Sequence, residues 1–257
     1  LATFAVAVLV VLVIHIPHPE QTAEGRALQT AIWRDALTGI RYLRSRKTLF
    51  SVALYVSLVN FLIGGAFALN TPYILTITRS ETTLGTLLGV MSAGAILGGV
   101  IMSAWGGTRP RIHTIMPGIA LSAACLAVYG MARSPLALGA TLFVLMVPLP
   151  MVNASFMSIM QTKVPPDLQG RVFAALSQIS LGLMPIAFAL VGPLSDRVFE
   201  PAVGGPGWDV VAPLVGSEPG AGMGLIFFIA GSLMLALTLA VYSRRSVREM
   251  EATLPDY

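Results

Sequence analysis

Long apolar segments alternate with short polar ones along the chain. Six of the long segments contain no Asp, Glu, Lys or Arg, and they cover residues 49–77, 85–106, 114–132, 136–161, 172–195 and 221–242. Each approaches or exceeds the ~20 residues that a helix needs to cross the hydrocarbon core of a bilayer. The pattern predicts six transmembrane helices, and therefore an all-α, polytopic membrane protein.

A shorter apolar segment, LATFAVAVLVVLVIHI, opens the chain at residues 1–16. As a helix it would reach only about 24 Å, short of the roughly 30 Å of hydrocarbon. It begins with Leu and has no basic flank, so it does not have the features of a signal peptide. We interpret it as the end of a truncated helix, and we expect the chain to be a fragment.

Composition and charge agree with a membrane location. Hydrophobic residues make up 55% of the chain and charged residues 11%, about half the charged share of a soluble domain. Alternate polar segments hold thirteen and three of the 16 Lys and Arg residues. By the positive-inside bias, we expect the richer set and the C-terminus to be cytoplasmic in a multi-pass protein of the cell (inner) membrane. The net charge of +4 then reflects sidedness and requires no nucleic-acid partner.

The polar turn QTKVPPDLQGRV at 161–172 separates two of the predicted spans. Its Pro-Pro pair is expected to end one helix, and Gly170 to let the backbone turn before the next. Arg171 would then lie at a helix N-terminus, where the macrodipole disfavours a cation unless a carboxylate such as Asp167 offsets it. We interpret Asp167, Gly170 and Arg171 as a cytoplasmic loop or gate. A snorkelling interfacial arginine is the alternative for Arg171.

Amides within the predicted spans are candidates for a binding cavity, because polar groups in mid-span usually face the interior of a bundle. Aromatic and thioether side chains lie near-integral numbers of helical turns from them and would suit a bulky amphipathic solute. An amide can instead tie two helices together by hydrogen bonding, and the sequence leaves both readings open. The candidate substrate-binding residues are Asn60, Phe67, Asn70, Asn153, Met157, Gln178 and Phe188.

Small residues and prolines predict how the helices pack and bend. Gly85, Gly89 and Ala93 recur every four residues, as do Gly94 and Gly98, which predicts close approach of a neighbouring backbone. Three prolines are expected to kink the spans that they interrupt: Pro148, Pro150 and Pro185.

Several motifs of other protein classes are absent from the sequence. His15, His18 and His113 have no Cys, Asp or Glu at ligand spacing, so we expect no metal site. Cys125 is the only cysteine, which excludes an internal disulfide. No hydrolase or phosphate-binding motif is present, so we expect neither an enzyme nor a cofactor.

Three stretches together carry a family resemblance: IWRDALTGIRYLRSRKTL at 32–49, QTKVPPDLQGRVFAALSQI at 161–179 and LVGSEPGAGMGLIFFIAG at 214–231. The chain resembles the C-terminal half of a major facilitator superfamily transporter, most closely the drug:proton antiporters of the macrolide-efflux and enterobactin-exporter type. The turn GGTRPR at 106–111 lacks the acidic residue that such transporters usually carry there.

The resemblance implies a six-helix C-terminal bundle of the major facilitator fold plus the tail of the preceding helix. The expected regions are the truncated end of transmembrane helix 6 (1–16), a cytoplasmic linker with an amphipathic helix (17–48), the bundle (49–242) and a cytoplasmic tail (243–257).

The resemblance also implies proton-coupled efflux of a hydrophobic or amphipathic small molecule by alternating access. The expected partners are that substrate, protons, the lipid bilayer and the missing N-terminal half, which would hold the coupling acid. A seven-helix receptor or a non-transport membrane protein is the alternative, because seven apolar segments with an inside C-terminus also suit that architecture.

Overall fold

The computed structural model of this protein describes residues 41 and 44–253, and within them all regular secondary structure is helical. The long elements are α4 (Lys47–Ala68), α5 (Asn70–Thr78), α6 (Glu81–Trp105), α7 (Ile112–Met131), α8 (Pro135–Met146), α9 (Pro148–Lys163), α10 (Pro166–Leu194) and α13 (Ala221–Ser243). The short elements are η1 (Ser195–Phe199), α11 (Glu200–Ala202), η2 (Trp208–Val210), α12 (Ala212–Val215), α14 (Arg245–Arg248) and α15 (Met250–Thr253). The predictions for residues 1–40, including the truncated helix and the amphipathic helix, lie outside the described residues.

In the part of the chain that the structure describes, six helical stretches are long and apolar enough to cross a membrane: 48–78, 81–105, 112–131, 135–163, 166–202 and 221–243. They confirm the six predicted spans and the all-α fold. The largest difference is in the fifth span, which was expected to end at residue 195. It continues through one π-helical turn, η1, into α11.

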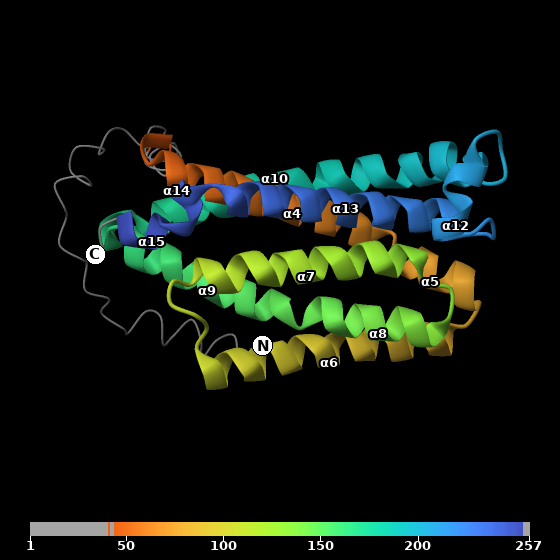
Figure 1. Cartoon of the computed structure of the whole chain (residues 1–257), viewed down its shortest axis with the longest axis horizontal. Helices are drawn as coiled ribbons and strands as arrows, with labels where there is room; N and C mark the ends of the chain where they lie inside the picture. The colour runs from red at the N-terminus through yellow and green to blue at the C-terminus, as the bar shows by residue number, and fades with distance from the viewer. Residues whose placement is uncertain (1–40, 42–43, 254–257) are drawn as a thin grey trace, which may run out of the picture.

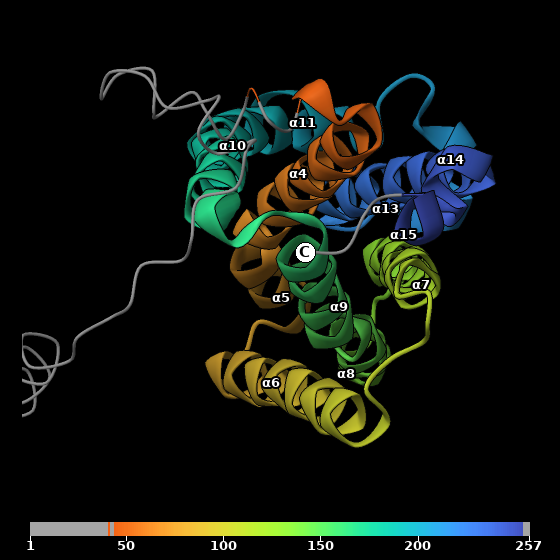
Figure 2. The same ribbon diagram turned by 90° about the vertical axis from the view of Figure 1, so that its left-hand side faces the viewer.

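The long helices run side by side along the long axis of the molecule (Figure 1). α7 packs along α13, α4 packs along α10, and α6 packs against α8 and α9. Seen from one end, α6 and α10 lie apart on one side of the bundle, and α7 and α13 lie together on the other (Figure 2).

The connecting segments alternate between the two ends of the bundle (Figure 1). We call the basic end the one that holds the connections at 106–111, 164–165 and 244–253, and the opposite end the one that holds 79–80, 132–134 and 203–220. The described segments that share the excess of Lys and Arg therefore lie together at one end, as a sorted membrane topology requires.

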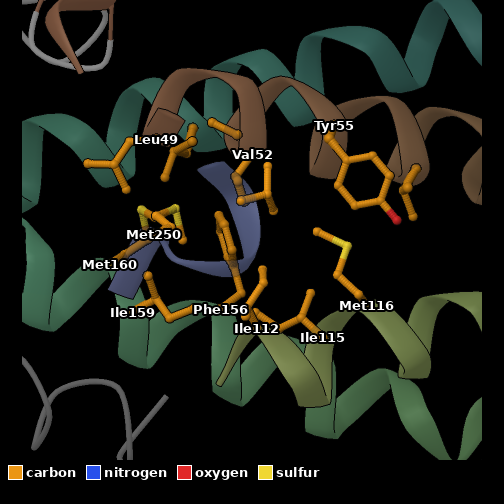
Figure 3. Packing of buried hydrophobic residues seen from close by; sticks show 14 of the residues in the cluster. Leu49, Val52, Tyr55, Ile112, Ile115, Met116, Phe156, Ile159, Met160 and Met250 are labelled. Carbon is orange, nitrogen blue, oxygen red and sulfur yellow. The ribbon is translucent and has the colours of Figure 1, made fainter. Parts of the chain in front are cut away.

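The core at the basic end includes part of the segment expected to be a cytoplasmic tail, residues 243–257. Leu49 of α4, Ile112 of α7 and Ile159 of α9 are fully buried in one cluster, and Met250 of α15 is buried in the same cluster (Figure 3). A second cluster fills the opposite half of the bundle around Tyr73. The tail helices α14 and α15 thus belong to the folded bundle.

Two of the spans are interrupted near prolines. The fourth span divides into α8 and α9 at Val147, directly before Pro148, which confirms the kink expected there. The first span divides at Leu69, a break that was not predicted. Pro72 follows three residues later and has no N–H to donate to the carbonyl of Ala68, which removes one bond of the helical ladder.

The predicted small-residue contacts of α6 are present at one pair of glycines only. A Cβ added at Gly94 or Gly98 would collide with the carbonyl oxygen of Phe143 or of Val147, so α6 lies directly on the backbone of the interrupted fourth span. A Cβ at Gly85 or Gly89 would meet nothing within 4 Å. The expectation of close packing was wrong for these two glycines within the described bundle.

The turn between α9 and α10 is shorter than expected. α10 already begins at Pro166, a favoured first helical residue because its missing N–H has no partner in the first turn anyway. Asp167, Gly170 and Arg171 therefore lie in the first two turns of α10, and the expectation that they form a loop was wrong. Asp167 in the first turn is favourably placed for the helix dipole.

Candidate substrate-binding face

Three of the candidate amides lie exposed on three different helices. They are Asn60 of α4, Asn153 of α9 and Gln178 of α10. At 1.5 Å per residue from the basic end, they lie roughly 20, 15 and 18 Å along their helices. All three amides are therefore at a similar depth, near the middle of a hydrocarbon core about 30 Å thick.

The apolar candidates lie at other depths. Met157 of α9 is 41% exposed and lies roughly 9 Å from the basic end, one turn from Asn153. Phe188 of α10 is 50% exposed, and Phe67 of α4 is partly buried. Both phenyl rings lie roughly 30 Å from the basic end, well beyond the amides. The seven candidates therefore do not form one compact cluster.

Asn70 differs from the other amides because it is buried, with 4% of its surface exposed. Its Oδ1 accepts a hydrogen bond of 2.6 Å from the hydroxyl of Tyr129 on α7. This is the helix-tying arrangement that the sequence left open for each amide. Asn70 joins α5 to α7, apart from the three exposed amides.

A buried aromatic group surrounds this bond. Tyr73 packs edge-on against Tyr129, with ring centroids 5.3 Å apart, and both rings contact Phe227 of α13. The Tyr73 hydroxyl lies 3.0 Å from the carbonyl oxygen of Gly130, one of the carbonyls left without an N–H partner at the end of α7. The group therefore closes the opposite end of the bundle.

Arg133 extends the same group to the connection at 203–220, at the opposite end of the bundle. Its guanidinium lies 5.9 Å from the centre of the Tyr73 ring, within the range of a cation–π contact, and Nη2 donates to the carbonyl oxygen of Val215. Nε and Nη1 are buried and have no hydrogen-bond partner in the described part of the chain. Sequence reasoning missed this group, because its members are dispersed over three spans.

Lys163 of α9 is charged but buried, with only 5% of the residue exposed. Its Nζ donates to the main-chain oxygen of Glu251 in α15. Oε1 of Glu251 in turn accepts a 2.8 Å hydrogen bond from the backbone N–H of Ile112 at the start of α7. The tail thereby connects the ends of α7 and α9 that lie at the basic end.

Comparison with known proteins gives one match. The profile of the Major Facilitator Superfamily matches residues 1–189, which include α4 to α9 and most of α10. No curated protein and no solved structure matches the chain.

Proposed function

The chain belongs to the Major Facilitator Superfamily, and from this premise we propose that it is the C-terminal bundle of a secondary transporter that exports a hydrophobic or amphipathic small molecule. Membership in a transporter superfamily favours this function over a seven-helix receptor. The macrolide-efflux or enterobactin-exporter type, and with it multidrug resistance, is part of the proposal and rests on the sequence resemblance alone.

One observation carries the proposal: amides from α4, α9 and α10 are exposed at a common depth in the hydrophobic region. Exposed amides are costly in hydrocarbon, so they belong on a surface that faces protein or a water-filled cavity. Transporters of this kind bind substrate near the bilayer midplane between two bundles. Asn60, Asn153 and Gln178 would line this bundle's share of such a cavity, with a second six-helix bundle completing it.

The apolar candidates would add substrate contacts above and below the amides. Met157 would contact the substrate toward the basic end, and Phe67 and Phe188 toward the opposite end. A flexible thioether and two rings around a few amides suit a bulky solute with a small polar portion. Asn70 would act indirectly, through its bond to α7.

Proton coupling and orientation are parts of the same proposal. The acidic residues of the described spans lie in their end turns or, for Asp196 and Glu200, in the last turns of the fifth span. A coupling acid within the membrane would then belong to the second bundle. The basic end would face the cytoplasm of the cell (inner) membrane, where the positive-inside bias places it, and Asp167 and Arg171 would contribute to an inner gate.

The test is transport by the complete protein in membrane vesicles. Asn60→Ala and Gln178→Ala are expected to reduce transport of at least one substrate several-fold at equal expression. Gln161→Ala removes an exposed amide at the basic end of α9 and is expected to leave transport unchanged. If both mid-span variants transport every tested compound normally, the cavity assignment fails. Export that persists after collapse of the proton gradient would refute proton coupling.

A further inference from the structure

A groove with only apolar lining residues lies between α4, α10 and α13. Its volume is about 220 Å³. An apolar cavity of roughly 150 Å³ already stays dry and takes up a molecule as large as benzene. The groove is therefore large enough to hold an apolar guest, and its lining side chains are all apolar, so they would not retain water.

The groove faces away from the proposed substrate cavity. On α4, its lining residue Leu62 lies two positions after Asn60, about 200° around the helix. On α10, its lining residue Ala187 lies nine positions after Gln178, roughly two and a half turns and so on the opposite side. A chain bound in the groove would not contact the exposed amides.

The depth of the groove places it within hydrocarbon. The lining residues Ile226 and Leu233 are five and twelve positions from the start of α13 at Ala221. These positions lie roughly 8 and 18 Å from the start of α13, which is at the opposite end of the bundle. The groove thus extends from the half of the bilayer that adjoins the opposite end to about the midplane, and most of it lies in the outer leaflet in the orientation proposed above.

The groove is closed toward that end by contact between the fifth and sixth spans. A Cβ added at Gly222 of α13 would lie 2.6 Å from the carbonyl carbon of Phe199 and 2.6 Å from the backbone nitrogen of Glu200. Oε1 of Glu200 also accepts a 2.9 Å hydrogen bond from the N–H of Met223. The π-helical turn brings Phe199 onto the groove as its end wall. A guest must therefore enter sideways from the bilayer.

The shape of the groove favours a narrow, flexible chain. Buried small residues form its floor, among them Gly65, Ala187 and Ala230. Large side chains form its rim: Leu190 and Ile229 are exposed on either side. A floor without side-chain bulk between two raised apolar edges accommodates an unbranched alkyl chain along its length.

We propose that this groove is a binding site for one acyl chain of a membrane phospholipid. The occupant comes from the leaflet that adjoins the opposite end of the bundle, and the chain lies between α10 and α13 over α4. Lipid on the other exposed faces would exchange rapidly with the bulk bilayer. The acyl chain in the groove would be held longer, because it contacts α4, α10 and α13 at the same time. The assignment to the outer leaflet depends on the orientation proposed above. The assignment of the groove as a lipid site does not depend on the proposed transport function.

Photocrosslinking in vesicles tests the proposal. The complete protein is reconstituted in phosphatidylethanolamine and phosphatidylglycerol that include phosphatidylethanolamine with a diazirine in mid-chain. Crosslinks are expected to be several-fold more abundant at Leu190 and Ile229 than at Leu239 of α13 or Val128 of α7, which have similar exposure outside the groove. Comparable yields at all four positions would indicate bulk lipid only and overturn the proposal.

Filling the groove provides a matched comparison. Ala230→Phe places a ring on the floor and is expected to reduce the groove crosslinks several-fold. Ala236→Phe, on an exposed position of the same helix beyond the groove, is expected to leave them unchanged. If Ala230→Phe does not fold, Ile229→Ser removes one apolar edge of the groove instead, and it is expected to reduce the crosslink at Leu190 on the other edge. Absence of lipid crosslinks at both Leu190 and Ile229, as expected if another segment of the protein covers the groove, would also overturn the proposal.

Transport measurements on the same samples separate the two proposals. If crosslinks are not enriched at Leu190 and Ile229 but Asn60→Ala still reduces transport, the lipid site is refuted and the transporter function stands. If the crosslinks are enriched but Asn60→Ala leaves transport unchanged, the substrate cavity is refuted and the lipid site stands.

Discussion

The hydroxyl of Tyr129 donates a 2.6 Å hydrogen bond to Oδ1 of Asn70, which joins α7 to the beginning of α5 within the apolar interior. α5 begins one residue after the interruption at Leu69. The bond therefore fixes a short helix that the continuous ladder of α4 no longer supports.

We expect Tyr129→Phe to destabilise the folded protein because it leaves the Asn70 carbonyl oxygen buried without a donor. Such losses cost about 1–3 kcal/mol in water-soluble proteins, whereas hydrogen bonds between membrane helices average about 0.6 kcal/mol. The free energy of unfolding in detergent should therefore fall by about 1 kcal/mol. In the double variant with Asn70→Leu, part of the loss should be recovered; simple additivity of the two losses would contradict the direct bond.

The glycines of α6 provide a second test. Gly98→Ala should lower the free energy of unfolding by about 1–3 kcal/mol, because its Cβ would be forced into the Val147 carbonyl. Gly89→Ala meets open space and should leave folding of the bundle unchanged or slightly improved through helix propensity. Thermal unfolding of both variants in detergent measures the contrast. Equal effects would mean that α6 does not lie on the fourth span as described.

The tail contact at Ile112 gives a third expectation. Glu251→Ala removes the acceptor for the first N–H of α7, a change comparable to loss of a helix cap, which costs about 0.5–2 kcal/mol. The tail should then separate from the core more often. A cysteine introduced at Met250 in a Cys125→Ala background should react slowly with a maleimide when Glu251 is present and faster in its absence.

Glu249→Ala is the matched control for the tail. Glu249 pairs with Arg245 on the exposed side of the same segment, and an exposed pair of this kind contributes little. Reactivity at position 250 should stay low in this variant. High reactivity in the unaltered tail would show that Met250 is not held in the core.

Sidedness is tested by labelling introduced cysteines from one face of the membrane, again in the Cys125→Ala background. Cysteines at Arg109 and Ser243 should react from the same face, because both connections lie at the basic end. Cysteines at Thr82 and Ser217 should react from the other face. Labelling of Arg109→Cys and Ser243→Cys from opposite faces would contradict the arrangement of the bundle.

Periodicity and charge exclusion predicted the spans well because each span must satisfy the same local requirement. A helix such as α13 must carry enough consecutive apolar residues to cross the bilayer, and that requirement is readable in one dimension. The break at Val147 was readable for a similar reason, since Pro148 follows directly and proline removes an N–H wherever it occurs in a helix. The break at Leu69 was missed, because the nearest following proline, Pro72, lies three residues further along the chain.

The candidate site was only partly readable. Sequence identified amides within the spans, but Asn60 and Asn70 have the same chemical character and lie in the same predicted span. One is exposed and the other is bonded to Tyr129, 59 residues away in the chain. That difference depends on which helix is adjacent, which no local pattern specifies.

The amino-acid sequence by itself determined that this is a helical membrane protein with six spans between residues 44 and 253, because ionic groups are too costly in hydrocarbon to be placed anywhere but between the spans. Only the tertiary structure decided which amides are exposed, that Lys163 and the tail are buried, and that α10 and α13 separate to leave an apolar groove. These features depend on contacts between residues distant in the chain, and in a uniformly apolar span the side-chain pattern favours no single neighbour.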